Sequence, residues 1–150
     1  QTETKMATLY EQLEKAKRLD SKRISDTLFD FIKSIQKKFT DINTEQLNKD
    51  SEDIFGDPIG FYSRATYFLT GKSGPYDMYD TGDFLKGFYI RVHNEMIFFG
   101  SKDPKTPLIL DNDNLLSRDL FGLQDDNLRE LIERDLLPFV IQYSRKSIDV

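Results

Sequence analysis

Asp80-Thr81-Gly82 is a triplet whose residue types match the catalytic loop of an aspartic protease. Such an enzyme needs two carboxylates that lie close together and share one proton, each presented by a strand-rich half of the molecule. The chain contains one copy of the triplet and would have to dimerise to supply both carboxylates. We therefore predict that the triplet is a structural turn. Its Asp and Thr side chains would bond to backbone N–H groups, and Gly82 would supply the positive φ before a strand that starts at Phe84.

Three other segments carry residue types that are used in ligand binding. Residues 71–73 are Gly-Lys-Ser, as at the end of a phosphate-binding loop, but that loop needs a glycine at the position of Thr66. Residues 111–114 start like a calcium-binding loop, which then lacks the glycine and the glutamate that its later positions require. His93 is the only histidine, and a metal site would need carboxylate partners at ligand spacing. We expect no catalytic residue, no cofactor and no metal site.

The composition indicates one globular domain. At 150 residues the chain has the size of an ordinary domain, and its 38% of hydrophobic and 13% of aromatic residues are enough for a packed core. The lack of cysteine excludes disulfides and thiolate chemistry. Apolar runs are too short to span a bilayer, so we expect no membrane partner. The net charge of −5 disfavours binding to nucleic acid, including sequence-specific binding.

The N-terminal part of the chain is predicted to be helical. Residues 5–40 contain neither Gly nor Pro, and their apolar residues recur at helical spacing. Asp20-Ser21 interrupts this pattern, which leaves open one long helix or two helices in series. We expect this region to pack on the sheet of a single domain, residues 1–150, with the option that helix 5–40 protrudes from it.

A further helix is predicted for residues 58–70. Asp57-Pro58 fits an N-cap followed by a proline at the first helical position, and Gly71 fits a C-terminal stop. The competing interpretation is a strand, which would place aromatic side chains on both of its faces.

The second half of the chain is predicted to form a small antiparallel sheet and a closing helix. Residues 84–92 alternate with a period of two, and residues 96–100 return as their partner after a short turn. Residues 106–110 are expected to add a third strand, which Pro107 confines to an edge. Residues 125–144 are expected to form the last helix, kinked or restarted at Pro138. The predicted fold class is α+β, with the helices packed on the sheet.

The residues around the turn resemble a family of bacteriophage proteins. The pattern consists of an Asp-Thr-Gly turn, one further residue and then a bulky apolar residue that opens a strand. This pattern resembles that of the tail-completion or neck family of long-tailed phages. The similarity covers residues 76–145, and residues 136–139 are similar to the C-terminal helix motif of that family. The chain departs from the family pattern in having Met78-Tyr79 before the turn, where Pro-Val is usual, and in lacking a later Glu-x-Gly-Thr loop.

The resemblance implies a structural protein without enzyme activity. Such a protein forms a homo-oligomeric ring in the virion, contacts the portal or connector and the tail-tube proteins, and leaves a conduit for DNA; it is made in the cytoplasm of the bacterial host. The alternative is an immunity-type protein that binds and inhibits a toxin, which the small size, the acidity and the lack of cysteine fit equally well. We expect contacts in the first helix and in the loop of residues 71–83, since loops commonly carry function. The interface residues that we expect are Lys72, Ser73, Tyr76, Tyr79 and Asp83.

Overall fold

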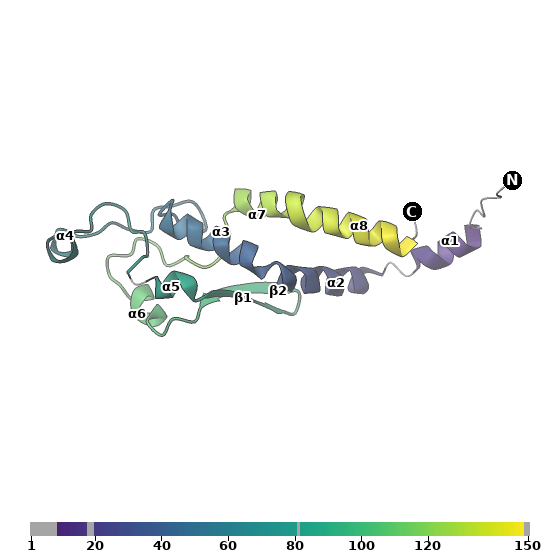
Figure 1. Cartoon of the computed structure of the whole chain (residues 1–150), viewed down its shortest axis with the longest axis horizontal. Coiled ribbons are helices and arrows are strands. Elements are labelled where there is room, and N and C mark those ends of the chain that lie inside the picture. The colour runs from purple at the N-terminus through teal and green to yellow at the C-terminus, as the bar shows by residue number, and fades with distance from the viewer. Residues whose placement is uncertain (1–8, 18–19, 81, 149–150) are drawn as a thin grey trace. The chain divides into compact units, whose positions relative to one another are not determined.

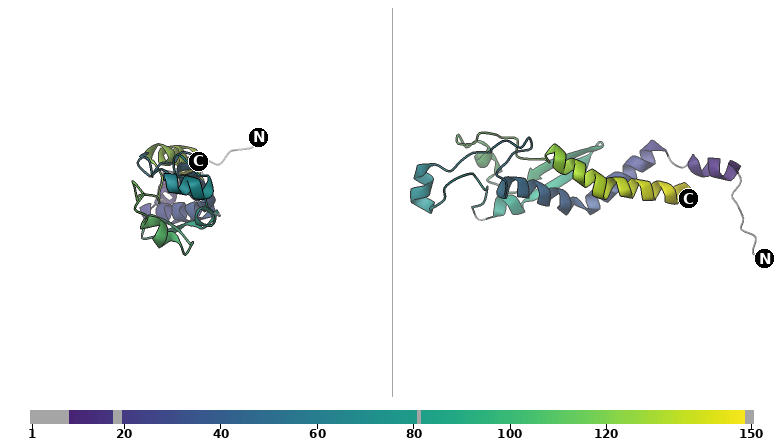
Figure 2. Two further views of the ribbon diagram at one scale, coloured as in Figure 1. Left: turned by 90° about the vertical axis from the view of Figure 1, so that its left-hand side faces the viewer. Right: turned by 90° about the horizontal axis from the view of Figure 1, so that it is seen from above.

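The chain has an α+β fold, as its sequence predicts. The computed structural model describes residues 9–17, 20–80 and 82–148. These residues divide into two compact units, whose elements are drawn in Figures 1 and 2: unit 1 contains the described residues up to 32 and from 130 onward, and unit 2 contains those between 33 and 129. The expectation of a single domain stays a prediction. Among the described residues, no helix is both long enough and apolar enough to cross a membrane.

Unit 1 is made of helices. Its elements are α1 (Leu9–Ala16), most of α2 (Ser21–Ser34), a π-helical segment η1 (Ile132–Leu136) and α8 (Leu137–Ile148). The helices α1 and α8 are in contact. The rings of Phe31 in α2 and Phe139 in α8 stack in parallel, with centroids 4.1 Å apart, and the Tyr143 ring lies 6.4 Å beyond Phe139. Aromatic packing between α2 and α8 therefore stabilises this unit.

The predicted N-terminal helical region, residues 5–40, is helical but divided. Its first residues lie outside the described part, and the remainder forms α1, α2 and the beginning of α3 (Gln36–Asn48). Asp20 caps the start of α2, since its carboxylate accepts the Arg23 N–H at 2.7 Å. Ile35 separates α2 from α3 because its backbone, with φ −109 and ψ 22, is not helical. A single continuous helix is therefore the wrong alternative.

The predicted C-terminal helix, residues 125–144, is also interrupted. It consists of α7 (Asp125–Leu131), then η1 and then α8, which continues to the last described residue. Pro138 lies in the first turn of α8, where a missing N–H is tolerated. The wider π turn before it, in which the Leu137 N–H donates to the Ile132 carbonyl, leads into the new α-helix. The sequence leaves open a helix that is kinked at Pro138 and a helix that restarts there. The restart describes the structure better.

Unit 2 contains the two-stranded sheet. Its strands are β1 (Phe88–His93) and β2 (Met96–Ser101). They pair antiparallel, with Phe88 opposite Ser101. The two residues that join them, Asn94 and Glu95, have φ of 49 and 60, as a tight hairpin turn of type I′ requires. Helix α3 packs against β1 (Figure 1), so the hairpin is covered on one side.

The predicted strand 96–100 is confirmed, whereas the predicted strand 84–92 begins too early. Residues Asp83–Lys86 instead form a one-turn helix, α5, which follows Gly82. The Phe84 and Phe88 rings meet edge to face at 5.1 Å. Residues four positions apart lie on one face of a helix as well as on one face of a strand, so alternation alone does not separate the two.

The third predicted strand, residues 106–110, is wrong. These residues form the short helix α6 (Thr106–Leu110), with Pro107 in its first turn. The Thr106 hydroxyl donates to the Asp103 carbonyl at 2.7 Å and stabilises the turn before the helix. Because proline suits the first turn of a helix as well as an edge strand, Pro107 does not distinguish these two structures.

Only the second half of the predicted helix 58–70 is helical. Helix α4 (Arg64–Thr70) begins after Ser63, whose hydroxyl accepts the Thr66 N–H at 3.1 Å. The preceding residues are extended and make isolated bridges to neighbouring segments. Gly60 among them has φ of 145, which is incompatible with a helix. The strand interpretation describes this first half better, although no regular strand forms.

The hydrophobic core of unit 2 gathers side chains from segments that are far apart in the sequence. Residues 111–124 contain no helix or strand, yet they supply Leu115 and Leu120 to this core. Gly60 allows a close approach of the Tyr76 ring, since a β-carbon at Gly60 would lie 2.5 Å from it. The buried residues that form the core are Leu47, Ile59, Tyr76, Phe84, Leu115 and Leu120.

Two buried polar side chains of α3 hold the irregular segment in place, and we call this pair the α3 clasp. The Asn43 amide donates to the Leu120 carbonyl at 2.8 Å, and its oxygen accepts the Gly122 N–H at 3.1 Å. Gln46, one turn later, donates to the Gly122 carbonyl at 3.1 Å and accepts the Gln124 N–H at 2.9 Å. The clasp therefore provides partners for backbone groups that no regular element would satisfy.

We expect Asn43→Ala to lower the free energy of unfolding by about 2–4 kcal/mol, because it leaves the Leu120 carbonyl and the Gly122 N–H without partners. Urea unfolding followed by circular dichroism measures this change. Lys37→Ala, at an exposed position of the same helix, is the matched control and should leave the midpoint almost unchanged. An equally small effect of Asn43→Ala would contradict the role given to the clasp.

Candidate functional site

Unit 2 contains a pocket of about 350 Å³. The described residues that line it come from two stretches of the chain: residues 62–84, which include α4 and the start of α5, and residues 103–115, which include α6. The walls are mostly apolar, and Tyr62, Tyr76 and Tyr79 all contribute to them. This volume lies at the lower end of the range for ligand pockets.

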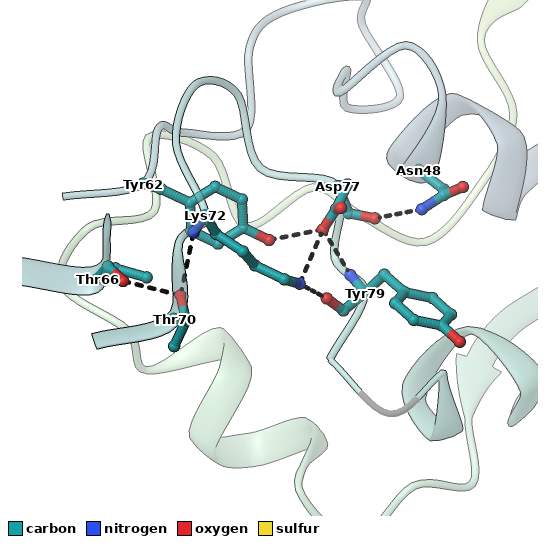
Figure 3. Close-up of polar contacts among 7 residues, drawn as sticks. All are labelled: Asn48, Tyr62, Thr66, Thr70, Lys72, Asp77 and Tyr79. Atoms are coloured by element: carbon teal, nitrogen blue, oxygen red, sulfur yellow. Dashed lines mark hydrogen bonds and ion pairs between the residues drawn. The ribbon is translucent and has the colours of Figure 1, made fainter. Parts of the chain in front are cut away.

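The Asp77 carboxylate organises the polar contacts beside this pocket (Figure 3). Its Oδ1 accepts the Tyr62 hydroxyl at 2.6 Å and the Tyr79 N–H at 2.9 Å, and it lies 3.6 Å from the Lys72 Nζ. The Asp77 backbone carbonyl accepts the Asn48 side-chain amide at 2.9 Å. The loop is thus attached both to the extended segment before α4 and to the end of α3.

Lys72 is held against two aromatic rings. Its ammonium lies 5.4 Å from the centroid of the Tyr62 ring and 5.9 Å from that of the Tyr79 ring, distances at which a cation is attracted to a ring face. The ammonium also donates to the Tyr79 carbonyl, and the Lys72 backbone N–H donates to the Thr70 hydroxyl at 3.3 Å. These contacts keep the lysine side chain at the pocket wall, where 34% of it is exposed.

The electrostatics of the cluster fix the charge state of its members. Burial raises the pKa of Tyr62, and the hydrogen bond to Asp77 and the charge of that carboxylate raise it further. Burial alone would also raise the pKa of Asp77, but the hydrogen bonds from Tyr62 and from the Tyr79 N–H, with the charge of Lys72, outweigh it and lower the pKa. At neutral pH Asp77 is ionised and Tyr62 is protonated, so neither is suited to exchange a proton with a substrate.

Four of the five expected interface residues, Lys72, Tyr76, Tyr79 and Asp83, line this pocket. Tyr76 is also part of the core and is 8% exposed. Ser73 is exposed in the loop, outside the lining. The structure thus brings most of these residues together around one hollow, and their role at an interface stays a prediction.

The Asp-Thr-Gly turn lies at the edge of the same pocket. Thr81 is outside the described residues, whereas Asp80 and Gly82 both line the pocket. Gly82 has φ of 87, and a β-carbon there would lie 2.9 Å from the Tyr79 ring, so both the backbone and the packing require glycine. Asp80 is exposed and makes no hydrogen bond or ion pair with the other described residues. The aspartate that holds this loop is Asp77.

The surroundings of Asp80 differ from those of a protease carboxylate. In the part of the chain that the structure describes, the one sheet has two strands. A helical turn, α5, follows Gly82 directly. An aspartic protease would need a strand-rich lobe that presents the carboxylate next to a second one.

The other segments with suitable residue types are explained by the fold. Gly71 ends α4 in a left-handed conformation, so it does not open a helix as the glycine of a phosphate loop does. His93 ends β1 and is exposed. In residues 111–114, the Asn112 side chain accepts the Asn114 N–H at 2.9 Å, as in an ordinary turn. Within the described ranges, no group of three or more acidic or histidine side chains could hold a metal ion.

Another carboxylate of unit 2, Asp53, is buried and structural. It accepts the Phe55 N–H at 2.8 Å and the Asp57 N–H at 2.9 Å. Burial would raise the pKa of Asp53, but the hydrogen bonds from Ser117 and from these N–H groups outweigh it and lower the pKa. The carboxylate therefore fixes the turn that leads into the extended segment before α4.

The contacts of Asp77 with Tyr62 and with Asn48 are not predicted by the sequence. The three residues belong to different segments, and no periodic pattern links them. Their contacts exist only because the loop after α4 folds back over residues 60–62. The only signal in the sequence is the frequency of aspartate between Pro75 and Asp83, which is typical of turns.

No protein-family model, no curated protein sequence and no solved structure matches this chain. The resemblance to the tail-completion family stays a prediction that depends on the short motif around Asp80.

We expect the free energy of unfolding to fall at acid pH, in part through Asp77. A carboxylate whose pKa is lowered by folding stabilises the folded chain above its ordinary pKa of 3.8, and this contribution is lost as the pH falls through the lowered value. The wild type should therefore be more stable than Asp77→Asn at neutral pH, and this difference should shrink as the pH falls below about 4. Urea unfolding over this pH range measures it.

Tyr62→Phe is the matched variant, because it removes the donor and keeps the carboxylate. It should be less stable than the wild type at neutral pH. Because the folded-state pKa of Asp77 then lies closer to its ordinary value, the loss of stability of this variant in acid should be smaller and should level off at a higher pH than that of the wild type. A difference between wild type and Asp77→Asn that stays constant over the whole range would contradict the lowered pKa of Asp77.

Proposed function

We propose that this protein is a non-catalytic assembly protein that binds copies of itself, and that it is a structural component of a ring in the neck or tail of a bacteriophage. The observation that carries the self-assembly is the exposed apolar surface of α4. The resemblance of residues 80–84 to the tail-completion family supports the assignment to a phage.

Helix α4 exposes large apolar side chains and buries none. Phe68 and Leu69 are 82% and 85% exposed, and Tyr67 is 52% exposed. Figures 1 and 2 show α4 at one end of unit 2, at the tip of a loop that leads away from α3. Large apolar side chains gathered on a surface typically mark a contact with another protein.

The polar contacts beside the pocket also favour binding over catalysis. Asp77 and Lys72 are paired with each other, and the Tyr62 hydroxyl is held by Asp77. These groups give the loop after α4 a fixed shape, which a binding surface needs in order to limit the entropy lost on association.

Within this proposal the protein requires no cofactor and acts through its contacts. Its partners are copies of itself, a portal or connector protein and tail-tube proteins, and it acts in the virion after synthesis in the host cytoplasm. The net charge of −5 suits a conduit, since an acidic ring repels the DNA that passes through it.

We expect the protein to form particles of several 17.5 kDa chains. Light scattering coupled to size-exclusion chromatography, over a series of protein concentrations, measures the mass. Phe68→Asp should shift the mass toward that of one chain, because it places a charge on the contact surface. Phe55→Asp is the matched control, since Phe55 is 70% exposed in unit 2 but lies outside α4.

A wild type that has the mass of one chain at every concentration would contradict the ring. The immunity-type protein would then be the better account. Such a protein should be a monomer or a dimer and should bind one toxin tightly through an acidic surface.

A further inference from the structure

The helix α4 presents opposite faces to its own pocket and to solvent. Thr66 and Thr70, one turn apart, line the pocket. Phe68 lies two positions from each of them, which corresponds to roughly 200° around a helix. The Phe68 side chain therefore points away from the pocket of its own chain, in agreement with its 82% exposure.

The pocket has the chemistry that suits an apolar side chain. Its walls are mostly apolar and include the core residues Tyr76, Phe84 and Leu115, with Ile109 of α6 beside them. Its volume of about 350 Å³ is large enough for one or two side chains but small for a folded element.

The charges around the two surfaces are complementary. α4 contains no acidic residue, and Arg64 at its beginning makes no ion pair with the other described residues. The lining of the pocket contains three carboxylates, Asp80, Asp83 and Asp103, and two lysines, Lys72 and Lys105. Lys72 is paired with Asp77. The three carboxylates outnumber the remaining lysine, so the border of the pocket is acidic on balance and complements a basic and apolar helix.

We propose that Phe68 of one copy of this chain inserts into the pocket of the next copy, with Arg64 directed toward the acidic border. The donor surface and the acceptor pocket lie on opposite sides of α4, so one copy cannot give and receive through the same patch. The contact is heterologous, and repeated head-to-tail contacts close into a ring when the rotation between copies allows it. This inference rests on the proposed self-assembly and names the surfaces that produce it.

The natural lack of cysteine allows a direct test by disulfide trapping. The variant Phe68→Cys/Ile109→Cys carries one thiol on the donor surface and one in the acceptor pocket. After mild oxidation we expect a ladder of linked chains on a non-reducing gel, because each copy joins two neighbours. The matched control, Phe68→Cys/Lys37→Cys, has its second thiol at an exposed position of α3 and should give no ladder.

Each other outcome of this experiment overturns the inference in a recognisable way. Linked dimers alone would indicate a reciprocal contact, and linkage within one chain would place Phe68 in its own pocket. A multimeric wild type without linkage between the two thiols would overturn the proposed contact and leave the self-assembly intact. A monomeric wild type would overturn both.

A second set of variants covers the case in which Ile109→Cys does not fold. Lys105→Cys places the acceptor thiol at an exposed position of the same pocket and should give the same ladder. Phe68→Ala, at a site that is 82% exposed, should weaken self-association at least about tenfold, since a buried aromatic anchor commonly dominates an interface. Unchanged self-association of Phe68→Ala would contradict the proposal, as would a small molecule that stays bound in the pocket of the multimer in native mass spectrometry.

Discussion

The α3 clasp is the interaction on which the rest of unit 2 depends. Residues 111–124 pass through the core without forming a helix or strand, and such a segment is stable only when its backbone groups find hydrogen-bond partners. Asn43 and Gln46 provide partners for four of these groups, in Leu120, Gly122 and Gln124, from one face of α3. With the segment fixed, Leu115 and Leu120 fill the core, and Leu115 also forms part of the pocket wall.

Unit 2 satisfies its polar groups internally and leaves apolar groups at its surface. Among the described residues that are not exposed, no buried side-chain nitrogen or oxygen lacks a hydrogen bond. Asp77, which belongs to a loop, is held by contacts from three directions. The exposed Phe68 and Leu69 on α4 are the opposite case, because they leave an apolar surface uncovered. A fixed shape that carries such a surface suits the self-assembly that we propose.

The sequence predicts the features whose signals are local. The turn between β1 and β2, the interruption of the helical pattern at Asp20-Ser21 and the loop position of Lys72 all follow from neighbouring residues. The α+β class follows from the helical and strand periods of the segments between such signals. The errors arise where one pattern fits two structures. The spacing around Phe84 fits a strand, as predicted, and also the helical turn that forms. Pro107 fits an edge strand, as predicted, and also the first turn of the helix that forms. The clasp and the contact of Asp77 with Tyr62 join segments that are distant in the sequence, so no local pattern could have indicated them.

Amide hydrogen exchange at Gly122 and Gln124 tests the role of the clasp most directly. These two N–H groups lie in an irregular segment and donate to the side chains of Asn43 and Gln46 rather than to another backbone group. If the clasp holds the core together, both amides should exchange as slowly as those in the middle of α3. Exchange as fast as that of an exposed loop amide such as Gly74 would contradict it.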